Sequence, residues 1–176
     1  NLPGDRLITT VMANLGLKVF LSGHDIACEM TPVGDRFVAA RMDESASALG
    51  GEQSGHVIFR DADRWFGDGL YTALRVLEVV RRAGQPLSEL CHGVEKYPQI
   101  LVNVRVREKP PTDAVPDLVA AQKTAEADLG DEGRVVLRYS GTEPLLRVMV
   151  EGKDIEKVQR HVDAMVAAAE HAIGVG

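Results

Sequence analysis

The chain has 176 residues, 45% of them apolar and 26% charged, and its 26 acidic residues outnumber its 20 basic ones to give a formal net charge of −6. This composition is typical of a soluble globular protein and excludes a disordered, collagen-like or disulfide-stapled chain. The acidic balance argues against a nucleic-acid binder, and no apolar run approaches the roughly 18 residues of a membrane span.

Three further features of the whole chain bear on its location and extent. The only cysteines, Cys28 and Cys91, lie far apart without C-x-x-C spacing, which is typical of a reducing cytosol and offers no zinc site. Residues 1–15 lack the basic start and continuous apolar core of a signal peptide. We therefore expect a cytoplasmic protein. Because the sequence begins at Asn1 without Met, we also expect it to be part of something longer.

The first half predicts strands that alternate with helices. The β-branched stretch at 7–12 predicts a strand, and the apolar spacing of residues 15–21 predicts a helix after it. A second strand is expected at 26–30 and a second helix near 37–42. The pair Gly50-Gly51 breaks this pattern, which resumes as a short strand at 57–59. This alternation predicts an α/β mixed-sheet domain.

A polar loop at 60–68 then leads into the most regular helix of the first half. Leu70, Leu74 and Leu77 recur at helical spacing between residues 69 and 82, and Asp68 is well placed as the N-cap. The segment 84–86 ends this helix. A short helical segment is expected at 87–93.

The second half predicts a smaller α+β domain in the order strand, helix, strand, strand, helix. The two prolines at 110–111 stop its first strand, Pro116 falls in the first turn of its first helix, and Asp154 caps its last helix. The expected strands are 100–106, 134–138 and 145–151, and the expected helices are 114–129 and 154–173, with a turn at 130–133. We place the domains at 1–94 and 95–176, with the boundary between residues 93 and 98.

The loop from Gly50 to His56 reads GGEQSGH and gathers polar side chains among three glycines. Glycines let the backbone turn sharply or approach a ligand closely. Glu52 can accept hydrogen bonds from two adjacent hydroxyls, and Ser54 and His56 can donate or accept them, which is the mixture that a sugar requires. The alternative is a tight turn whose polar residues only face water.

The loop from Arg138 to Pro144 reads RYSGTEP, and Arg147 follows it. Its hydroxyls, its guanidinium groups and the backbone N–H groups freed by Gly141 suit a phosphate, which arginine binds in a bidentate manner and backbone amides cradle. Glu143 would repel a phosphate unless its side chain turns away, and pairing with Arg138 or Arg147 is one way to achieve this. The alternative is a β-hairpin whose loop residues bond to their own backbone.

Five segments in register resemble the α-D-phosphohexomutase superfamily and, within it, the bacterial phosphoglucosamine mutase family. They are TVMANLGL (10–17), VGDRFV (33–38), GGEQSGH (50–56), PQILVNVRV (98–106) and RYSGTEPLLRVMVEG (138–152). Gln53 supports that family, because phosphomannomutase and phosphoglucomutase relatives typically carry Met there. The resemblance covers nearly the whole chain. It implies a C-terminal part of a four-domain enzyme, namely the third and fourth domains.

For the longer enzyme, the resemblance implies conversion of glucosamine 6-phosphate to glucosamine 1-phosphate through a phosphoserine and glucosamine 1,6-bisphosphate. Asp35 is a further candidate for a sugar contact or an acid–base group; the alternative is that it caps the helix that begins near Arg36. The residues that match the family's sugar contacts are Glu52, Gln53, Ser54, Gly55 and His56, and those that match its phosphate contacts are Arg138, Ser140, Gly141, Thr142 and Arg147.

The resemblance also implies parts that this sequence does not contain. The family's phosphorylated serine lies in a T-A-S-H-N-P loop and its Mg²⁺ in a D-G-D-G-D-R loop, and neither occurs here. Gly4-Asp5-Arg6 resembles the tail of the metal loop, but one carboxylate is too few for a cation that prefers several oxygens. We therefore expect this chain alone to have no catalytic residue, no metal site and no mutase activity.

The remaining expectations concern other residues and partners. His24, His92, His161 and His171 have no metal-like spacing and are expected on solvated or helical surfaces, and the methionines are expected in the core. The expected partner is a phosphorylated hexosamine, with no nucleic acid and no membrane. A homodimer of the longer protein is left open, and a hinge is expected at 93–98.

Two other functions stay open at this point. One is that of a phosphomannomutase or phosphoglucomutase relative. The other is a non-catalytic module that binds sugar phosphates or serves in assembly.

Overall fold

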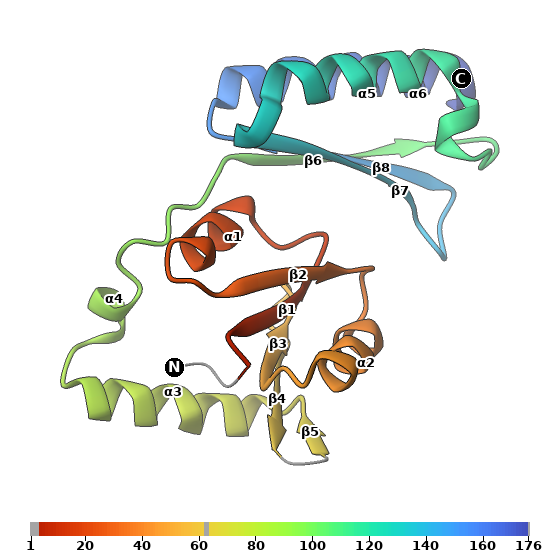
Figure 1. Cartoon of the computed structure of the whole chain (residues 1–176). Coiled ribbons are helices and arrows are strands. Elements are labelled where there is room, and N and C mark those ends of the chain that lie inside the picture. Colours follow the sequence, from red (N-terminus) through yellow and green to blue (C-terminus); the bar gives the residue numbers. More distant parts are fainter. Residues whose placement is uncertain (1–3, 62–63, 176) are drawn as a thin grey trace. The chain divides into compact units, whose positions relative to one another are not determined.

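The computed structural model describes residues 4–61 and 64–175 (Figure 1). The chain divides into two compact units, Asn1–Lys96 and Tyr97–Gly176. Within the described ranges, no helix combines the length and the apolar character needed to cross a membrane.

The first unit is built on a five-stranded mixed sheet in the order β2-β1-β3-β4-β5. Strand β1 runs parallel to β2 and β3, whereas the β3–β4 and β4–β5 pairs are antiparallel. The strands are β1 (Arg6–Thr10), β2 (Ala27–Thr31), β3 (Leu49–Gly51), β4 (Val57–Asp61) and β5 (Arg64–Phe66). The predicted α/β class with a mixed sheet is therefore confirmed.

Two of these strands correct the sequence prediction. Gly50-Gly51 does not break the pattern but forms β3, which pairs with both β1 and β4. Glycine fits this strand because a Cβ at Gly50 would lie 2.6 Å from Met42 Sδ and 2.7 Å from Val38 Cγ1. The expected loop at 60–68 contains β5, whose Trp65 pairs with Arg60; residues 62 and 63 of that segment lie outside the described part of the chain.

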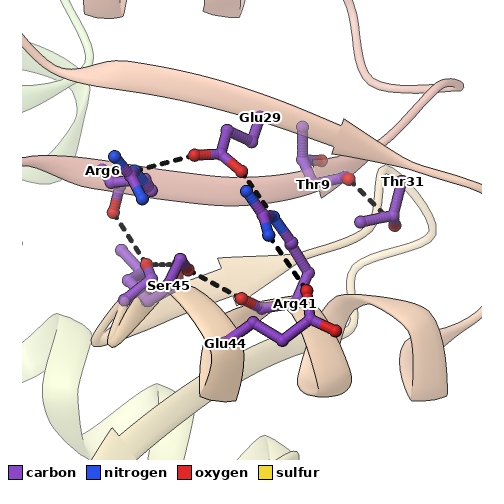
Figure 2. Close-up of polar contacts among 9 residues, drawn as sticks. Arg6, Thr9, Glu29, Thr31, Arg41, Glu44 and Ser45 are labelled. Carbon is purple, nitrogen blue, oxygen red and sulfur yellow. Dashed lines mark hydrogen bonds and ion pairs between the residues drawn. The ribbon is translucent and has the colours of Figure 1, made fainter.

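Helix α2 (Asp35–Ser45) covers one face of this sheet. Its Val38 and Met42 pack with Ile8 of β1 and Ile58 of β4, and all four side chains are 0–1% exposed. Figure 2 shows a polar contact on the same side: Glu29 of β2 lies between Arg6 of β1 and Arg41 of α2, at 2.8 Å and 2.6 Å. These ion pairs fix the helix against the edge of the sheet that carries β2.

The other helices of this unit are α1 (Leu15–Ser22), α3 (Gly69–Ala83) and α4 (Leu87–Leu90). Asn14 caps α1 by accepting a hydrogen bond from the Gly16 N–H at 3.1 Å. Asp68 caps α3 as predicted, accepting from the Tyr71 N–H at 2.7 Å. The apolar stripe of α3 is not covered, however, and no residue of that helix is buried. Leu70, Leu74 and Leu77 are 73%, 57% and 62% exposed.

The second unit has a three-stranded antiparallel sheet in the order β6-β8-β7, with α5 and α6 side by side on one face (Figure 1). Its elements are β6 (Gln99–Arg105), the 3₁₀ turn η1 (Thr112–Ala114), α5 (Pro116–Leu129), the 3₁₀ turn η2 (Gly130–Glu132), β7 (Gly133–Tyr139), β8 (Leu145–Gly152) and α6 (Ile155–Ile173). The predicted order of strand, helix, strand, strand and helix is confirmed. Asp154 caps α6 as predicted, accepting from the N–H groups of Glu156 and Lys157 at 2.9 Å and 3.2 Å.

The core of this unit lies between the sheet and the two helices. Alternate residues of β8, Leu146, Val148 and Val150, face Val158, Val162, Met165 and Ala169 of α6 there, and all are fully buried. The period of two along β8 thus meets the helical period of α6 across the core. Met42, Met149 and Met165 are buried, as expected, whereas Met12 and Met30 are only half-buried.

His161 corrects another prediction. It lies on α6 but is only 6% exposed, and its Nε2 is 2.8 Å from Asp128 Oδ2 at the end of α5. Asp128 also pairs with Lys157 and Arg160 at 3.1 Å each, and these hydrogen bonds, led by that of His161, hold the pKa of Asp128 well below its usual range. The histidine is buried because α5 supplies it with a partner. His24, His92 and His171 are exposed, as expected.

Candidate functional site

The 50–56 loop closes the hairpin between β3 and β4. The Glu52 N–H donates to the His56 carbonyl at 2.9 Å and the Gly55 N–H donates to the Glu52 carbonyl at 3.0 Å, so the backbone turns within the loop. The turn leaves the side chains of Gln53 and Ser54 exposed. Nothing described lies within 4 Å of where a Cβ at Gly55 would be, so a ligand can approach the backbone there.

The carboxylate of Glu52 ties this loop to the start of α2. Its Oε1 accepts a hydrogen bond from the Gly34 N–H at 3.0 Å, and Gly34 has a φ of 135°, which disfavours other residues. Gly34, not Asp35, is the N-cap of α2, so the predicted cap is wrong by one position. Asp35 instead opens the helix, and its Oδ1 accepts from the Arg36 N–H at 2.7 Å.

This arrangement brings Asp35 and His56 together although they lie far apart in the sequence. Asp35 Oδ2 lies 3.7 Å from His56 Nδ1, and His56 Nε2 lies 3.2 Å from the Gly67 carbonyl oxygen. A Cβ at Gly67 would be 2.4 Å from His56 Nε2, so only glycine leaves room for the ring. The loop and the VGDRFV segment therefore form one polar group that offers two carboxylates and an imidazole.

A cavity of about 470 Å³ lies on the opposite face of the sheet from α2. Its lining includes Leu7, Leu49 and Val57 together with Glu52 and Gln53, and it is mostly apolar. A sugar needs hydrogen-bonding partners for each hydroxyl, so this cavity does not have the character of a sugar site. The polar side chains of residues 52–56 with Asp35 are the better candidate.

The 138–144 loop joins β7 to β8 in the second unit, and its backbone is held by its own hydrogen bonds. The Ser140 N–H donates to the Leu145 carbonyl at 2.9 Å. Ser140 Oγ accepts from the Glu143 N–H at 3.3 Å, and the residue is 3% exposed. The expected alternative, in which the loop bonds to its own backbone, thus applies to Ser140. Gly141 and Thr142 remain exposed.

Two arginines lie directly opposite each other at the base of this loop. Arg138 of β7 and Arg147 of β8 are cross-strand neighbours, an arrangement that is destabilising for like charges. The Nε atom of each is buried without a hydrogen-bond partner. Burial, followed by the charge of Arg147, lowers the pKa of Arg138. Glu143 Oε2, at 3.8 Å from Arg147 Nη2, offsets part of this charge, and so takes one of the two partners predicted for it.

Buried guanidinium N–H groups without partners are costly, and here two of them share one face of a sheet beside an open loop. An anion with several oxygens, such as phosphate, would satisfy both groups and reduce their mutual repulsion. This group of residues therefore has the charge and the free donors that an anion requires.

One residue at this loop was missed by the sequence analysis. Lys109, which follows β6, donates from Nζ to the Ser140 carbonyl at 2.7 Å. Lys109 lies 31 positions before Ser140 in the sequence. A single lysine after a strand is common, so no local pattern indicated this contact.

No three His, Cys, Asp or Glu side chains among residues 4–61 and 64–175 converge in a way that could hold a metal ion. Asp5, the one carboxylate of the Gly4-Asp5-Arg6 segment, is exposed before β1. The described residues therefore do not fit a magnesium site.

Comparison with known proteins identifies the class to which this fold and these loops belong. Residues 1–97 match the model of the phosphoglucomutase/phosphomannomutase α/β/α domain III, and residues 101–168 match the C-terminal domain of the same family. The chain belongs to the phosphoglucomutase/phosphomannomutase family.

Within that family the chain is a homologue of the phosphoglucosamine mutases. It is 45% identical over 175 residues to the phosphoglucosamine mutase of Koribacter versatilis, covering 99% of this chain and 38% of that protein. It is 49% identical over 159 residues to that of Saccharopolyspora erythraea, covering 90% of this chain and 36% of that protein. The chain thus spans less than two fifths of the length of these relatives.

Solved structures agree on the fold. A crystal structure of Aspergillus fumigatus N-acetylphosphoglucosamine mutase in complex with glucose 1,6-bisphosphate matches 97% of this chain and 39% of its own, with a TM-score of 0.79 and 18% identity. A second structure of that enzyme, in complex with GlcNAc-6P and magnesium, has a TM-score of 0.78. At this identity the likeness concerns the fold alone.

Proposed function

We propose that the chain is the sugar- and phosphate-binding half of a phosphoglucosamine mutase. The observation that carries the proposal is the pair Arg138 and Arg147, whose buried Nε atoms lack partners. In this proposal the phosphate is bound by Arg138, Ser140, Gly141, Thr142 and Arg147, and the sugar hydroxyls by Asp35, Glu52, Gln53, Ser54, Gly55 and His56.

The surroundings of Gly141 support the proposal that this loop binds phosphate. A Cβ at Gly141 would meet nothing described within 4 Å, and its φ is not among the positive ones. Neither packing nor backbone conformation in the free chain therefore calls for glycine. Glycine is instead explained by a ligand that approaches the backbone N–H closely.

In the longer enzyme that we propose, a phosphoserine gives its phosphoryl group to the free hydroxyl of glucosamine 6-phosphate, and glucosamine 1,6-bisphosphate forms. The bisphosphate turns around, and its other phosphoryl group returns to the serine to leave glucosamine 1-phosphate. The phosphate that does not react must be held in both orientations. Phosphoryl transfer gains chiefly from positioning and charge stabilisation, so residues that form no covalent bond are still essential. This chain carries no such serine loop, and we expect it to bind the sugar phosphates without converting them.

Titration calorimetry with the 176-residue chain tests this function. We expect glucosamine 6-phosphate and glucosamine 1-phosphate to bind, inorganic phosphate to bind more weakly, and glucosamine to bind weakest. The absence of binding by both sugar phosphates would reject the proposal. Equal affinity for glucose 6-phosphate or mannose 6-phosphate would favour a phosphoglucomutase or phosphomannomutase relative, and a Gln53→Met variant would show whether Gln53 sets the preference.

The upstream gene sequence separates an enzyme from a non-catalytic binding module. We expect it to encode a T-A-S-H-N-P-like and a D-G-D-G-D-R-like segment. An open reading frame without both segments would favour the module.

A further inference from the structure

The position of Lys109 is fixed by its own segment. After β6, the Val106 N–H donates to the Pro144 carbonyl at 3.0 Å and the Arg107 N–H donates to the Ile173 carbonyl at 3.0 Å. The first bond reaches the 138–144 loop and the second reaches the end of α6. The backbone leading to Lys109 is therefore held beside the loop, and the lysine needs only a short reach to the Ser140 carbonyl.

The bond to Ser140 constrains the next N–H group along the chain. The Ser140 carbonyl and the Gly141 N–H belong to one peptide unit, which is planar and, because the described residues contain no cis bonds, trans. In a trans unit the C=O and the N–H point in opposite directions. A cation bound to the Ser140 oxygen therefore faces away from whatever binds the Gly141 N–H.

The hydrogen bond from Lys109 also makes the Gly141 N–H a stronger donor. A charge-assisted hydrogen bond to the carbonyl polarises the peptide unit and makes its N–H a better donor. No backbone hydrogen bond of the described residues uses the Gly141 N–H, and the space at its Cα is open. The peptide is thus held and polarised from one side while the other side stays accessible.

We propose that Lys109 is a positioning residue of the phosphate site, which holds the Ser140–Gly141 peptide so that the Gly141 N–H faces the phosphate. Lys109 acts through this peptide and does not touch the ligand. The inference rests on the function proposed above and adds a residue from outside both loops.

Nuclear magnetic resonance of the ¹⁵N-labelled 176-residue chain tests the inference. We compare Lys109→Met, which removes the donor, with Lys109→Arg, which retains a cationic donor, and with Lys123→Met, which removes the same charge from an exposed position on α5. In the ligand-free chain, Lys109→Met should shift the Gly141 amide resonance, and Lys123→Met should leave it in place. This readout reports the orientation of one peptide, which a general loss of stability does not mimic.

The same samples are titrated with inorganic phosphate and with glucosamine 6-phosphate. We expect Lys109→Met to raise both Kd values about three- to ten-fold, the scale of one hydrogen bond, Lys109→Arg to restore most of the affinity, and Lys123→Met to match the unmodified chain. An unmoved Gly141 resonance, or equal affinities for Lys109→Met and the unmodified chain, would overturn the inference while leaving the proposed function intact. If the unmodified chain binds neither ligand, the proposed function fails and this inference fails with it.

Discussion

Replacement of Arg138 by Met should weaken ligand binding without lowering the stability of the chain. Methionine keeps most of the apolar stem of the side chain and removes the guanidinium group, so packing changes little. The variant loses the charged donor that we assign to the phosphate. It also removes one of two like charges that face each other across β7 and β8.

The two effects have opposite signs. Hydrogen bonds to a charged group contribute about 1–3 kcal/mol, so we expect affinity for glucosamine 6-phosphate to fall about 5- to 150-fold. Relief of repulsion between cross-strand neighbours contributes about 0.2–1 kcal/mol in the other direction. The free energy of unfolding should therefore stay level or rise by up to about 1 kcal/mol, which raises Tm by a few degrees in a unit of this size.

Titration calorimetry gives the affinity and scanning calorimetry gives the Tm. The matched control is Arg160→Met, because Arg160 carries the same charge on α6, where it pairs with Asp128 at 3.1 Å; its affinity should equal that of the unmodified chain. If Arg138→Met binds as well as the unmodified chain, the anion site is wrongly assigned. If affinity and Tm fall together, Arg138 supports the fold and the reasoning from its buried, unpaired Nε is refuted.

Three further predictions concern single residues. Gly141→Ala should leave Tm within about 1 °C, since its Cβ meets nothing within 4 Å, yet weaken phosphate binding about ten-fold or more by blocking close approach; unchanged affinity in phosphate titration would contradict this. Glu151→Gln should lower the free energy of unfolding by about 3–5 kcal/mol in urea, because Glu151 is fully buried against Arg134 at 2.8 Å and the substitution removes the negative charge that this cation faces; a loss below about 1 kcal/mol would contradict burial of the pair. Asp128→Asn should flatten the acid side of the stability curve. The pKa of Asp128 is lowered in the folded chain, so its contribution is present above about pH 4 and is lost as the pH falls towards the folded pKa; an unchanged slope of Tm against pH below about pH 4 would contradict it.

Much of the fold could be predicted because its signals are local. Asp68 and Asp154 cap α3 and α6 as predicted, since an N-cap depends on the few residues that follow it. The short strands β3 and β5 were missed because they exist only through pairing with neighbours. Gly50 is poor in intrinsic strand preference, and its place in β3 is decided by the approach of α2.

In the candidate site, too, local contacts could be predicted and contacts between distant segments could not. The pairing of Glu143 with Arg147 spans four positions and could be predicted as one of two possibilities. The contact between Asp35 and His56 joins two segments. The composition of its loop made His56 a candidate and the family resemblance added Asp35, but no local pattern indicated that the two side chains meet. His161 was misplaced because its partner Asp128 is 33 residues away on another helix. Such contacts depend on tertiary packing, which a single sequence pattern does not report.

The exposed apolar stripe of α3 makes this helix prone to local unfolding. A helix of 15 residues is marginal in water without packing, since most helical stability comes from a buried face. Tyr71 anchors only its first turn, through ring contacts with Phe59 and Phe66 at 5.2 Å and 5.6 Å. Amide exchange should therefore be fastest towards the end of α3, and limited proteolysis should cut there first. Because α3 follows the five strands of the first sheet in the chain, such a cut leaves that sheet complete with its 50–56 loop. The 138–144 loop stays on the three-stranded sheet of the second unit.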